Sequence, residues 1–310
     1  MVAAARIRDS LDRFFDSDIW FSFKRSKVTV AAAIVSGAMV LAALIAPWIS
    51  PQNPFDPAAL DLLDAFTPPV WYEDGNPRFL LGTDDQGRDM LSALLYGSRI
   101  SIMVGLISVV LAMAIGISLG LIAGYVGGTV DAVIMRVADV QITFPAILVA
   151  LLIDGVARGV LPNERHDELA LAVIVTALGL SIWPQFARTV RGSTMVEKNK
   201  EYVQAARVIG LSRGLIMVRH VLPNVMGPVL VIATINLAIA VLGEATLSFL
   251  GVGVPPTEPS LGTLIRIGND FLFSGEWWIV IFPGVTLATL ILSVNLLGDW
   301  LRDALNPKLR

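Results

Sequence analysis

Long runs without charged residues dominate the pattern of the chain. Five of them measure about twenty residues or more: Val28–Ser50, Ile100–Val130, Leu169–Ala187, Val221–Gly243 and Trp277–Gly298. A sixth run, Val140–Ile153, is shorter and reaches spanning length only with the preceding turns that carry Asp131, Arg136 and Asp139. A helix needs about 20 mostly apolar residues to cross the hydrocarbon, and a backbone exposed to lipid must satisfy its own hydrogen bonds. The pattern therefore predicts an all-α membrane protein with six transmembrane helices.

These runs also divide the chain. We expect an N-terminal helical region over residues 1–27, a first span over 28–49 and an outer loop over 50–98. Residues 99–310 would form a core of five further spans, with an ordered inner loop over 191–223. The run that begins at Val28 is too long for the apolar part of a signal peptide, so we expect it to remain as a span.

Lysine and arginine predict the orientation. On the six-span reading, the N-terminal tail, the segment 188–219 and the C-terminal tail carry six, seven and three of them. The three outer loops share six, and Arg136 falls inside a span. Because basic residues concentrate in cytoplasmic segments, we expect both termini in the cytoplasm. Residues 6–23 mix charges with aromatic bulk and are interpreted as an interfacial amphipathic helix, with a plain tail as the alternative.

The first outer segment, residues 51–98, is rich in proline and in acidic side chains. Such a loop can serve as a landing surface for a soluble partner, or it can merely cover the spans.

The largest inner segment predicts two short helices. Asn199 is the expected N-cap of the first, with Glu201 in its first turn, and Gly210 marks its end. Ser212 is expected to cap a second helix that ends at Pro223. The small residues Ala205 and Ala206 lie beside Tyr202 and Val203, which suits docking into a groove of another protein. The alternative is a helix pair resting on the membrane surface.

Composition and motifs exclude several classes of protein. The chain has 310 residues, 16% of them charged, a net charge of −3 and no cysteine, with a mean hydropathy of +0.70. A soluble enzyme, a nucleic-acid partner and a thiolate metal site are therefore disfavoured. The two histidines, His166 and His220, exclude a histidine-rich metal centre. No GxxxxGK[ST] loop exists, so any ATPase must be another chain.

The sequence Gly116–Gly120 matches the GxSxG pattern of a nucleophilic serine, but it lies within an uncharged run without a strand-to-helix turn. A packing role explains it better. One small residue recurs every four positions, at Ala112, Gly116, Gly120 and Gly124, and this gives the helix a smooth face that another helix can approach closely.

Isolated charges and prolines mark the spans. Arg136 and Asp139 are three residues apart and are expected to form an ion pair on one helical face. Glu244, near the outer end of the fifth span, either lines a pathway or sits at the membrane interface. A proline interrupts four of the apolar stretches and is expected to kink the helix there: Pro145, Pro184, Pro228 and Pro283.

Two motifs resemble those of a known family. The inner loop is similar to the EAA-type loop of the membrane subunits of bacterial binding-protein-dependent ABC importers, at Glu201, Ala205, Ala206, Gly210, Leu222 and Pro223. The stretch Leu80–Asp89 resembles the LGTDxxGRD element of the C-type permease of dipeptide and oligopeptide transporters. Further matches to that subfamily are Gly124–Gly128 with Asp131, Met135, Arg136 and Asp139, then Phe249–Gly251, and finally Gly298–Pro307.

The resemblance implies a type I ABC importer fold, paired with a homologous B-type permease above two cytoplasmic ATP-binding subunits. An extracytoplasmic solute-binding protein would deliver the substrate, and docking is expected around Asp84, Asp85, Arg88 and Asp89. The inner loop would be the coupling helix, with Glu201, Tyr202, Ala205, Ala206, Gly210, Leu222 and Pro223 as its coupling residues. No cofactor or metal is expected on this chain, because ATP and Mg²⁺ would bind the ATPase subunits. No catalytic residue is expected either.

The family leaves the cargo open. Di- or oligopeptides are the expected solutes, and nickel chelates or glutathione are the alternatives within the same family. Two hypotheses from other classes are a stand-alone secondary transporter and an intramembrane hydrolase. The secondary transporter would need its own ion-coupling site, and it leaves the ordered inner loop unexplained.

Overall fold

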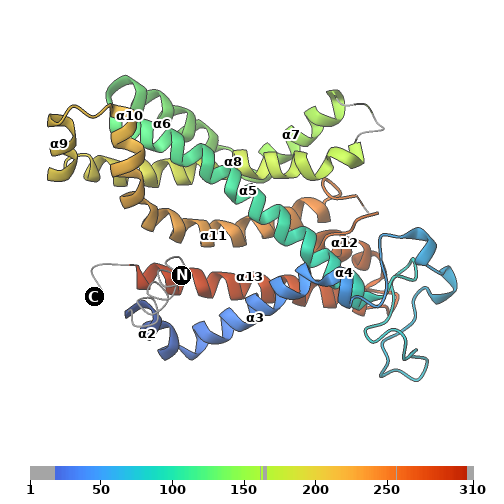
Figure 1. Ribbon diagram of the computed structural model, residues 1–310. Coiled ribbons are helices and arrows are strands. Elements are labelled where there is room, and N and C mark those ends of the chain that lie inside the picture. Colours follow the sequence, from blue (N-terminus) through green and yellow to red (C-terminus); the bar gives the residue numbers. More distant parts are fainter. Residues whose placement is uncertain (1–17, 161, 163–165, 256, 306–310) are drawn as a thin grey trace, which may run out of the picture.

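The computed structural model describes residues 18–160, 162, 166–255 and 257–305. Long helices run side by side along a common direction (Figure 1), and no strand occurs in these ranges. The long helices are α3 (Lys27–Leu44), α5 (Met90–Val126), α8 (His166–Glu197), α11 (Leu222–Phe249) and α13 (Trp278–Ala304). Between them lie α6 (Gly128–Thr143), α7 (Ala146–Val160), α9 (Glu201–Val208), α10 (Arg213–Ile216), the π-helical turn η4 (Met217–Val221) and α12 (Leu261–Phe271). Shorter pieces are α2 (Asp18–Arg25), α4 (Ala46–Ile49), η1 (Pro57–Ala59) and η2 (Leu62–Asp64).

Five helices in the described ranges are long and apolar enough to cross a membrane, and the count rises to six when α6 and α7 are taken as one span. The expected sixth run, Val140–Ile153, is not one straight helix, because α6 and α7 meet at an angle of 93°. Pro145 has no N–H to continue the helix, and it disfavours helical dihedrals in the residue before it. Phe144 is accordingly extended, with φ −86° and ψ 131°. The other three prolines, at 184, 228 and 283, lie inside continuous helices.

The most extensive helix pair is α5 with α8, and it forms along the small-residue face of α5. A methyl group added to Gly116 would lie 2.5 Å from Cβ of Phe186, and one added to Gly120 would lie 2.5 Å from the carbonyl oxygen of Ala187. The backbones therefore approach to a distance that only glycine permits. Ser118 faces outward and donates a hydrogen bond to the carbonyl of Ala114 at 2.7 Å, as a helical serine commonly does.

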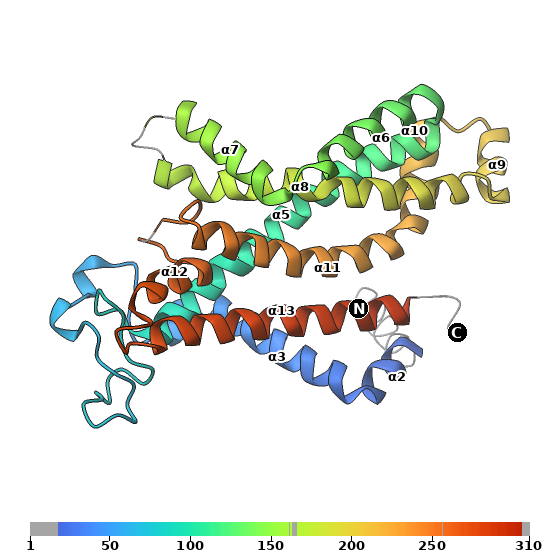
Figure 2. The same ribbon diagram turned by 180° about the vertical axis from the view of Figure 1, so that it is seen from behind.

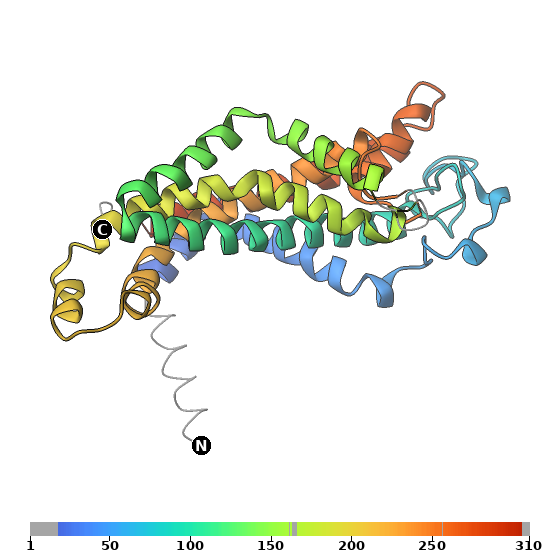
Figure 3. The same ribbon diagram turned by 90° about the horizontal axis from the view of Figure 1, so that it is seen from above.

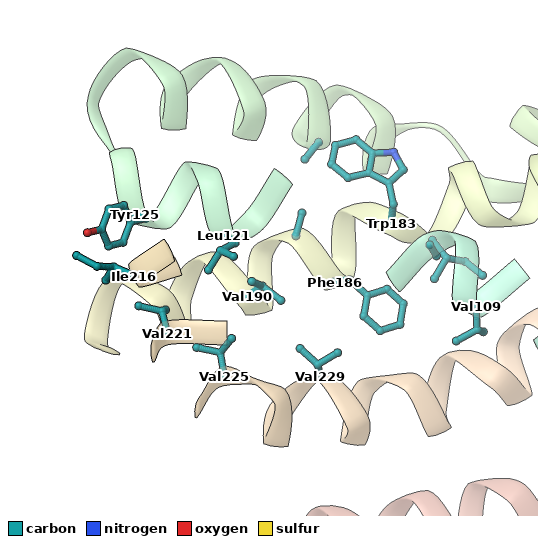
Figure 4. Close-up of a cluster of buried hydrophobic side chains, with 14 of the residues drawn as sticks. Val109, Leu121, Tyr125, Trp183, Phe186, Val190, Ile216, Val221, Val225 and Val229 are labelled. Atoms are coloured by element: carbon teal, nitrogen blue, oxygen red, sulfur yellow. The ribbon is translucent and has the colours of Figure 1, made fainter. Parts of the chain in front are cut away.

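The main apolar cluster lies where α5, α8 and α11 meet, and Figure 4 shows its side chains filling the space between these helices. Phe186 and Val190 of α8 and Val229 of α11 have no exposed surface. The same cluster includes Val203 and Ala206 of α9. The loop after α8 is thus part of the core and not an appendage.

The two ends of the bundle differ. Helices α9, α10 and α2 and the last turns of α13 lie at one end, whereas the segment 50–89, α12 and the end of α7 lie at the other (Figures 1 and 2). Seen from above, α6 and α7 arch over one side of the bundle (Figure 3). Part of the expected N-terminal interfacial helix, residues 6–17, lies outside the described residues. The remainder belongs to α2, where the ring of Phe23 packs edge-on against Trp300 at 5.2 Å.

We expect Gly116→Ala to destabilise the fold by about 1–3 kcal/mol, because the new methyl group meets Phe186 and the carbonyl of Trp183. Gly37→Ala in α3 is the matched control, since nothing lies within 4 Å of its added methyl group. Thermal unfolding in detergent measures both. Equal unfolding midpoints for the two variants would contradict the packing role.

Candidate functional site

Helix α9 follows directly after α8, and its start differs from the expected one. Its N-cap is Lys200, which makes no side-chain cap, and Asn199 instead donates to the carbonyl of Met195 at 3.0 Å. The expectation that Asn199 caps α9 is therefore wrong. The reason is that α8 continues to Glu197, so the amide of Asn199 is used to close the end of α8.

Gly210 ends α9, and it adopts φ +87°, a conformation that glycine enters without strain. Its N–H donates to the carbonyl of Arg207 at 3.0 Å, and the N–H of Leu211 donates to Ala206 at 3.2 Å. This pair of bonds is a Schellman motif. Ser212 then caps α10 by accepting from the N–H of Leu215.

The second inner helix does not end at Pro223, contrary to expectation. Helix α10 continues through η4 into α11, and Pro223 lies in the first turn of α11. The π-helical turn η4 directly precedes this proline, with the N–H of Leu222 donating to the carbonyl of Met217, and the helix continues past it. Leu222 and Pro223 thus lie within a continuous helix and are not the end of the loop.

Helix α9 has two different faces. Val203 and Ala206 are buried in the main cluster, at 0% and 4% exposure, so Ala206 faces its own bundle and is not available to a groove of another protein. Glu201 and Ala205 are exposed. Beyond them, Val208 and Ile209 are 87% and 77% exposed. Sequence reasoning missed these two apolar residues, although their β-branched side chains before Gly210 are a visible signal.

Tyr202 joins three elements through its hydroxyl. It donates to the Glu197 carboxylate at the end of α8 and accepts from Asn224 of α11 at 3.2 Å. Burial, followed by the hydrogen bond to Glu197, raises the pKa of Tyr202 to about 12. The hydroxyl therefore keeps its proton near neutral pH and remains a donor. Lys200 adds a 2.8 Å ion pair to the same carboxylate.

Two ion pairs connect α8 to α6, and the expected pair between Arg136 and Asp139 is wrong. Arg136 is exposed, while Asp139 pairs with Arg188 of α8 at 2.5 Å. Asp131 accepts two hydrogen bonds from Arg191, at 2.5 and 2.6 Å. Because α8 runs beside α6, it offers Asp139 a cation that spacing within one helix does not reveal.

Glu244 is fully buried, at 0% exposure. Its carboxylate accepts from Ser101 of α5 at 2.6 Å and from Ser248 at 2.7 Å. The Ser101 hydroxyl also accepts from the N–H of Leu261, at the start of α12. Within the described chain Glu244 is therefore enclosed among three helices at the end opposite α9.

The LGTDxxGRD stretch, Leu80–Asp89, folds into a compact and largely buried turn at the same end, which we call the clasp. Asp84, Arg88 and Asp89 are at most 1% exposed. Arg88 Nε donates to Asp84 at 2.6 Å, and Asp89 caps α5 by accepting from the N–H of Ser92 at 2.8 Å. The expectation that these three side chains receive a docking protein is wrong, since their polar groups are used inside the chain.

Asp85 is the partly exposed member of this motif, with 28% of its side chain accessible. Burial and then repulsion from Asp84 raise the pKa of Asp85. The clasp is fixed to the rest of the chain by Trp278, whose indole N–H donates to the carbonyl of Thr83 at 2.9 Å. Gly82 permits this contact, because its φ of +80° and its closeness to Thr67 leave no room for a side chain.

Comparison with known proteins identifies the family. Residues 116–310 match the model "Binding-protein-dependent transport system inner membrane component", and residues 15–69 match the N-terminal transmembrane domain of oligopeptide transport permease C. The chain belongs to this family of transport permeases. It is therefore a multi-pass protein of the bacterial inner membrane and a permease subunit.

Several relatives are similar over nearly the whole chain. The dipeptide transport system permease protein DppC of Haemophilus influenzae is 40% identical over 94% of this chain and 95% of its own length. DppC of Escherichia coli K12 is 41% identical, covering 94% and 93%. The di/tripeptide permease DppC of Pseudomonas aeruginosa is 39% identical, covering 94% and 92%.

A solved structure supports the fold. A chain of the inward-facing MetNI methionine ABC transporter superposes with a TM-score of 0.55, covering 70% of this chain and 98% of its own. The sequence identity is 17%, so the likeness concerns the fold alone. The fold is that of a type I ABC importer membrane subunit. Among the described residues, no group of three or more histidine or acidic side chains is placed to hold a metal ion.

We expect Arg88→Ala to destabilise the protein by about 3–5 kcal/mol, because it leaves the Asp84 carboxylate buried without its cation. Arg78→Ala is the control. Its ion pair with Asp64 spans 3.5 Å with 66% of the arginine side chain exposed, so its loss should cost less than about 1 kcal/mol. Unfolding in detergent compares them, and a stable Arg88 variant would show that the clasp has no structural role.

Proposed function

We propose that this chain forms one half of the translocation pathway of an ATP-driven importer for di- or oligopeptides. The relatives at about 40% identity are dipeptide permeases, and the similarity covers nearly their whole length. This supports a peptide cargo. The second half of the pathway would be a homologous B-type permease. Two ATP-binding subunits would hold ATP and Mg²⁺, and a solute-binding protein would supply the peptide.

The observation that carries the coupling proposal is the two-faced helix α9. One face is locked into the core through Val203 and Ala206, while Val208 and Ile209 project from the end of the bundle with most of their surface exposed. Exposed apolar residues at a helix end commonly anchor a partner. We assign contact with an ATPase groove to Glu201, Ala205, Val208 and Ile209, and Gly210 shapes the turn beside them.

Tyr202 would transmit the motion. When the ATPases close on ATP, α9 is displaced, and the hydroxyl of Tyr202 carries that displacement to Glu197 of α8 and Asn224 of α11. Helix α8 moves together with α5 because their backbones are in contact at Gly116 and Gly120. The result is rigid-body alternating access, in which ATP and the loaded binding protein favour the same state.

The excess of basic residues near α9, α10 and the chain ends favours a cytoplasmic position for this end of the bundle. The clasp end would then face the binding protein. Exposed loop residues such as Leu62 and Leu63, at 74% and 91%, are the candidates for that contact in place of the buried acidic motif.

Transport by the complete complex in proteoliposomes tests the cargo. With the binding protein and ATP supplied, we expect labelled dipeptide to accumulate and unlabelled dipeptide to compete. Accumulation of nickel chelate or glutathione that peptide does not inhibit would show that the cargo is one of the alternative solutes of the family. Uptake without ATPase subunits, driven by an ion gradient, would instead favour a secondary transporter.

The docking face has its own test. We expect the double variant Val208→Asp with Ile209→Asp to lose most of the co-purifying ATPase, because two charges replace the apolar contact. Phe273→Asp is the control, since that side chain is 98% exposed and follows α12 at the opposite end. Normal recovery of ATPase with the double variant would place docking elsewhere.

Tyr202→Phe separates transmission from docking, because it removes only the hydroxyl that joins α9 to α8 and α11. We expect normal assembly, ATP hydrolysis within about twofold of wild type, and a severalfold lower ratio of peptide transported to ATP hydrolysed. Tyr96→Phe is the control, because Tyr96 lies in α5 near the clasp and its ring contacts Phe55. An unchanged ratio for Tyr202→Phe would exclude this route of coupling.

A further inference from the structure

A cavity of about 380 Å³ lies where the end of α5 meets α9 and α10. It is lined by Tyr125, Val126, Arg207, Leu211, Arg213 and Ile216. Figure 4 shows Tyr125 and Ile216 close together at one end of the main cluster. The cavity therefore forms where the core ends, between a spanning helix and the inner loop, and its volume suits a small headgroup.

The charged groups of this lining are all cationic. Arg207 and Arg213 supply two guanidinium groups, and no carboxylate lines the cavity. Within the described residues neither arginine forms a salt bridge. Arg207 is held over the ring of Tyr125 at 5.2 Å, and its Nε donates to the phenol at 3.4 Å. One guanidinium is thus oriented in advance, which lowers the cost of binding an anion.

The position along the bundle points to the edge of a bilayer. Val126 is the last residue of α5, a spanning helix, and is 49% exposed. Helix α2 and the last turns of α13 lie at the same end of the bundle (Figure 1), and they carry the aromatic residues Trp20 and Trp300. Aromatic and basic side chains gather at the level of the lipid headgroups. Helix α9 lies farther out than this level (Figure 1).

We propose that this cavity binds the phosphodiester group of an anionic phospholipid. The planar guanidinium groups of Arg207 and Arg213 match phosphate oxygens, while Val126, Leu211 and Ile216 provide apolar contacts for the glycerol and the first methylenes. The apolar part of the lining favours a lipid over free phosphate. A bound lipid would brace α9 and α10 against the end of α5. This site is independent of the proposed cargo.

Lipid retention tests the proposal in the complete transporter with its ATPase subunits. The complex is purified from an equimolar mixture of phosphatidylglycerol and phosphatidylcholine, and the retained lipids are counted by mass spectrometry. We expect the wild type to enrich phosphatidylglycerol. Each basic residue near a membrane surface adds about a fivefold preference for an anionic lipid. The double variant Arg207→Gln with Arg213→Gln should therefore lower the enrichment by about 25-fold.

Two variants serve as controls. Arg219→Gln removes one charge from the same loop outside the cavity lining and should retain the lipid as wild type does. Arg207→Lys preserves the charge but not the planar fork, so it should retain more phosphatidylglycerol than the double glutamine variant, which separates charge from folding. Equal retention by the double variant and the wild type would overturn the proposal.

Two further outcomes would also overturn it. Displacement of phosphatidylglycerol by an equal concentration of inorganic phosphate would make the cavity a site for free anions. Enrichment that appears only after the ATPase subunits are removed would show that an acidic group of the ATPase occupies the cavity.

Discussion

The close contact between α5 and α8 is the constraint on which the rest of the structure depends. Between apolar helices in a membrane the hydrophobic effect offers little attraction, so packing must supply it. The small-residue face of α5 lets the two backbones approach, and Phe186 and Val190 then fill the space toward α11. In the coupling that we propose, this contact would carry a movement of the end of α8 to α5.

The inner loop is built into the same core as that pair, and the proposed coupling depends on this. Val203 and Ala206 replace lipid or water contacts with contacts to the bundle, and Tyr202 fixes the angle of α9 through polar bonds to α8 and α11. A flexible loop would absorb a push from a partner. A loop that is packed into the core and hydrogen-bonded to α8 and α11 would instead transmit a displacement to those helices, which is why we propose that coupling occurs here.

At both ends of the molecule, carboxylates of the spanning helices follow one rule: they bond to groups on neighbouring helices. Asp131 and Asp139 are paired across helices with Arg191 and Arg188, and Glu244 is enclosed by serine hydroxyls. Unpaired charges in an apolar setting are costly, so each carboxylate also holds neighbouring helices together. The cavity beside Tyr125 departs from this rule, since its two arginines have no acidic partner in the described residues.

The sequence by itself determined the membrane class, the positions of five spans, the small-residue face of α5 and the turn at Gly210, because each depends on composition or on local backbone freedom. Only the tertiary structure decided which side chains are accessible. Ala205 and Ala206 are neighbours in sequence, but the first is exposed and the second is buried. The charges of Asp84 and Arg88 suggest a surface position, but the fold of the clasp buries both side chains. It also decided the partner of Asp139, since ion pairs and exposure depend on which helices lie side by side, and spacing within one helix does not encode this.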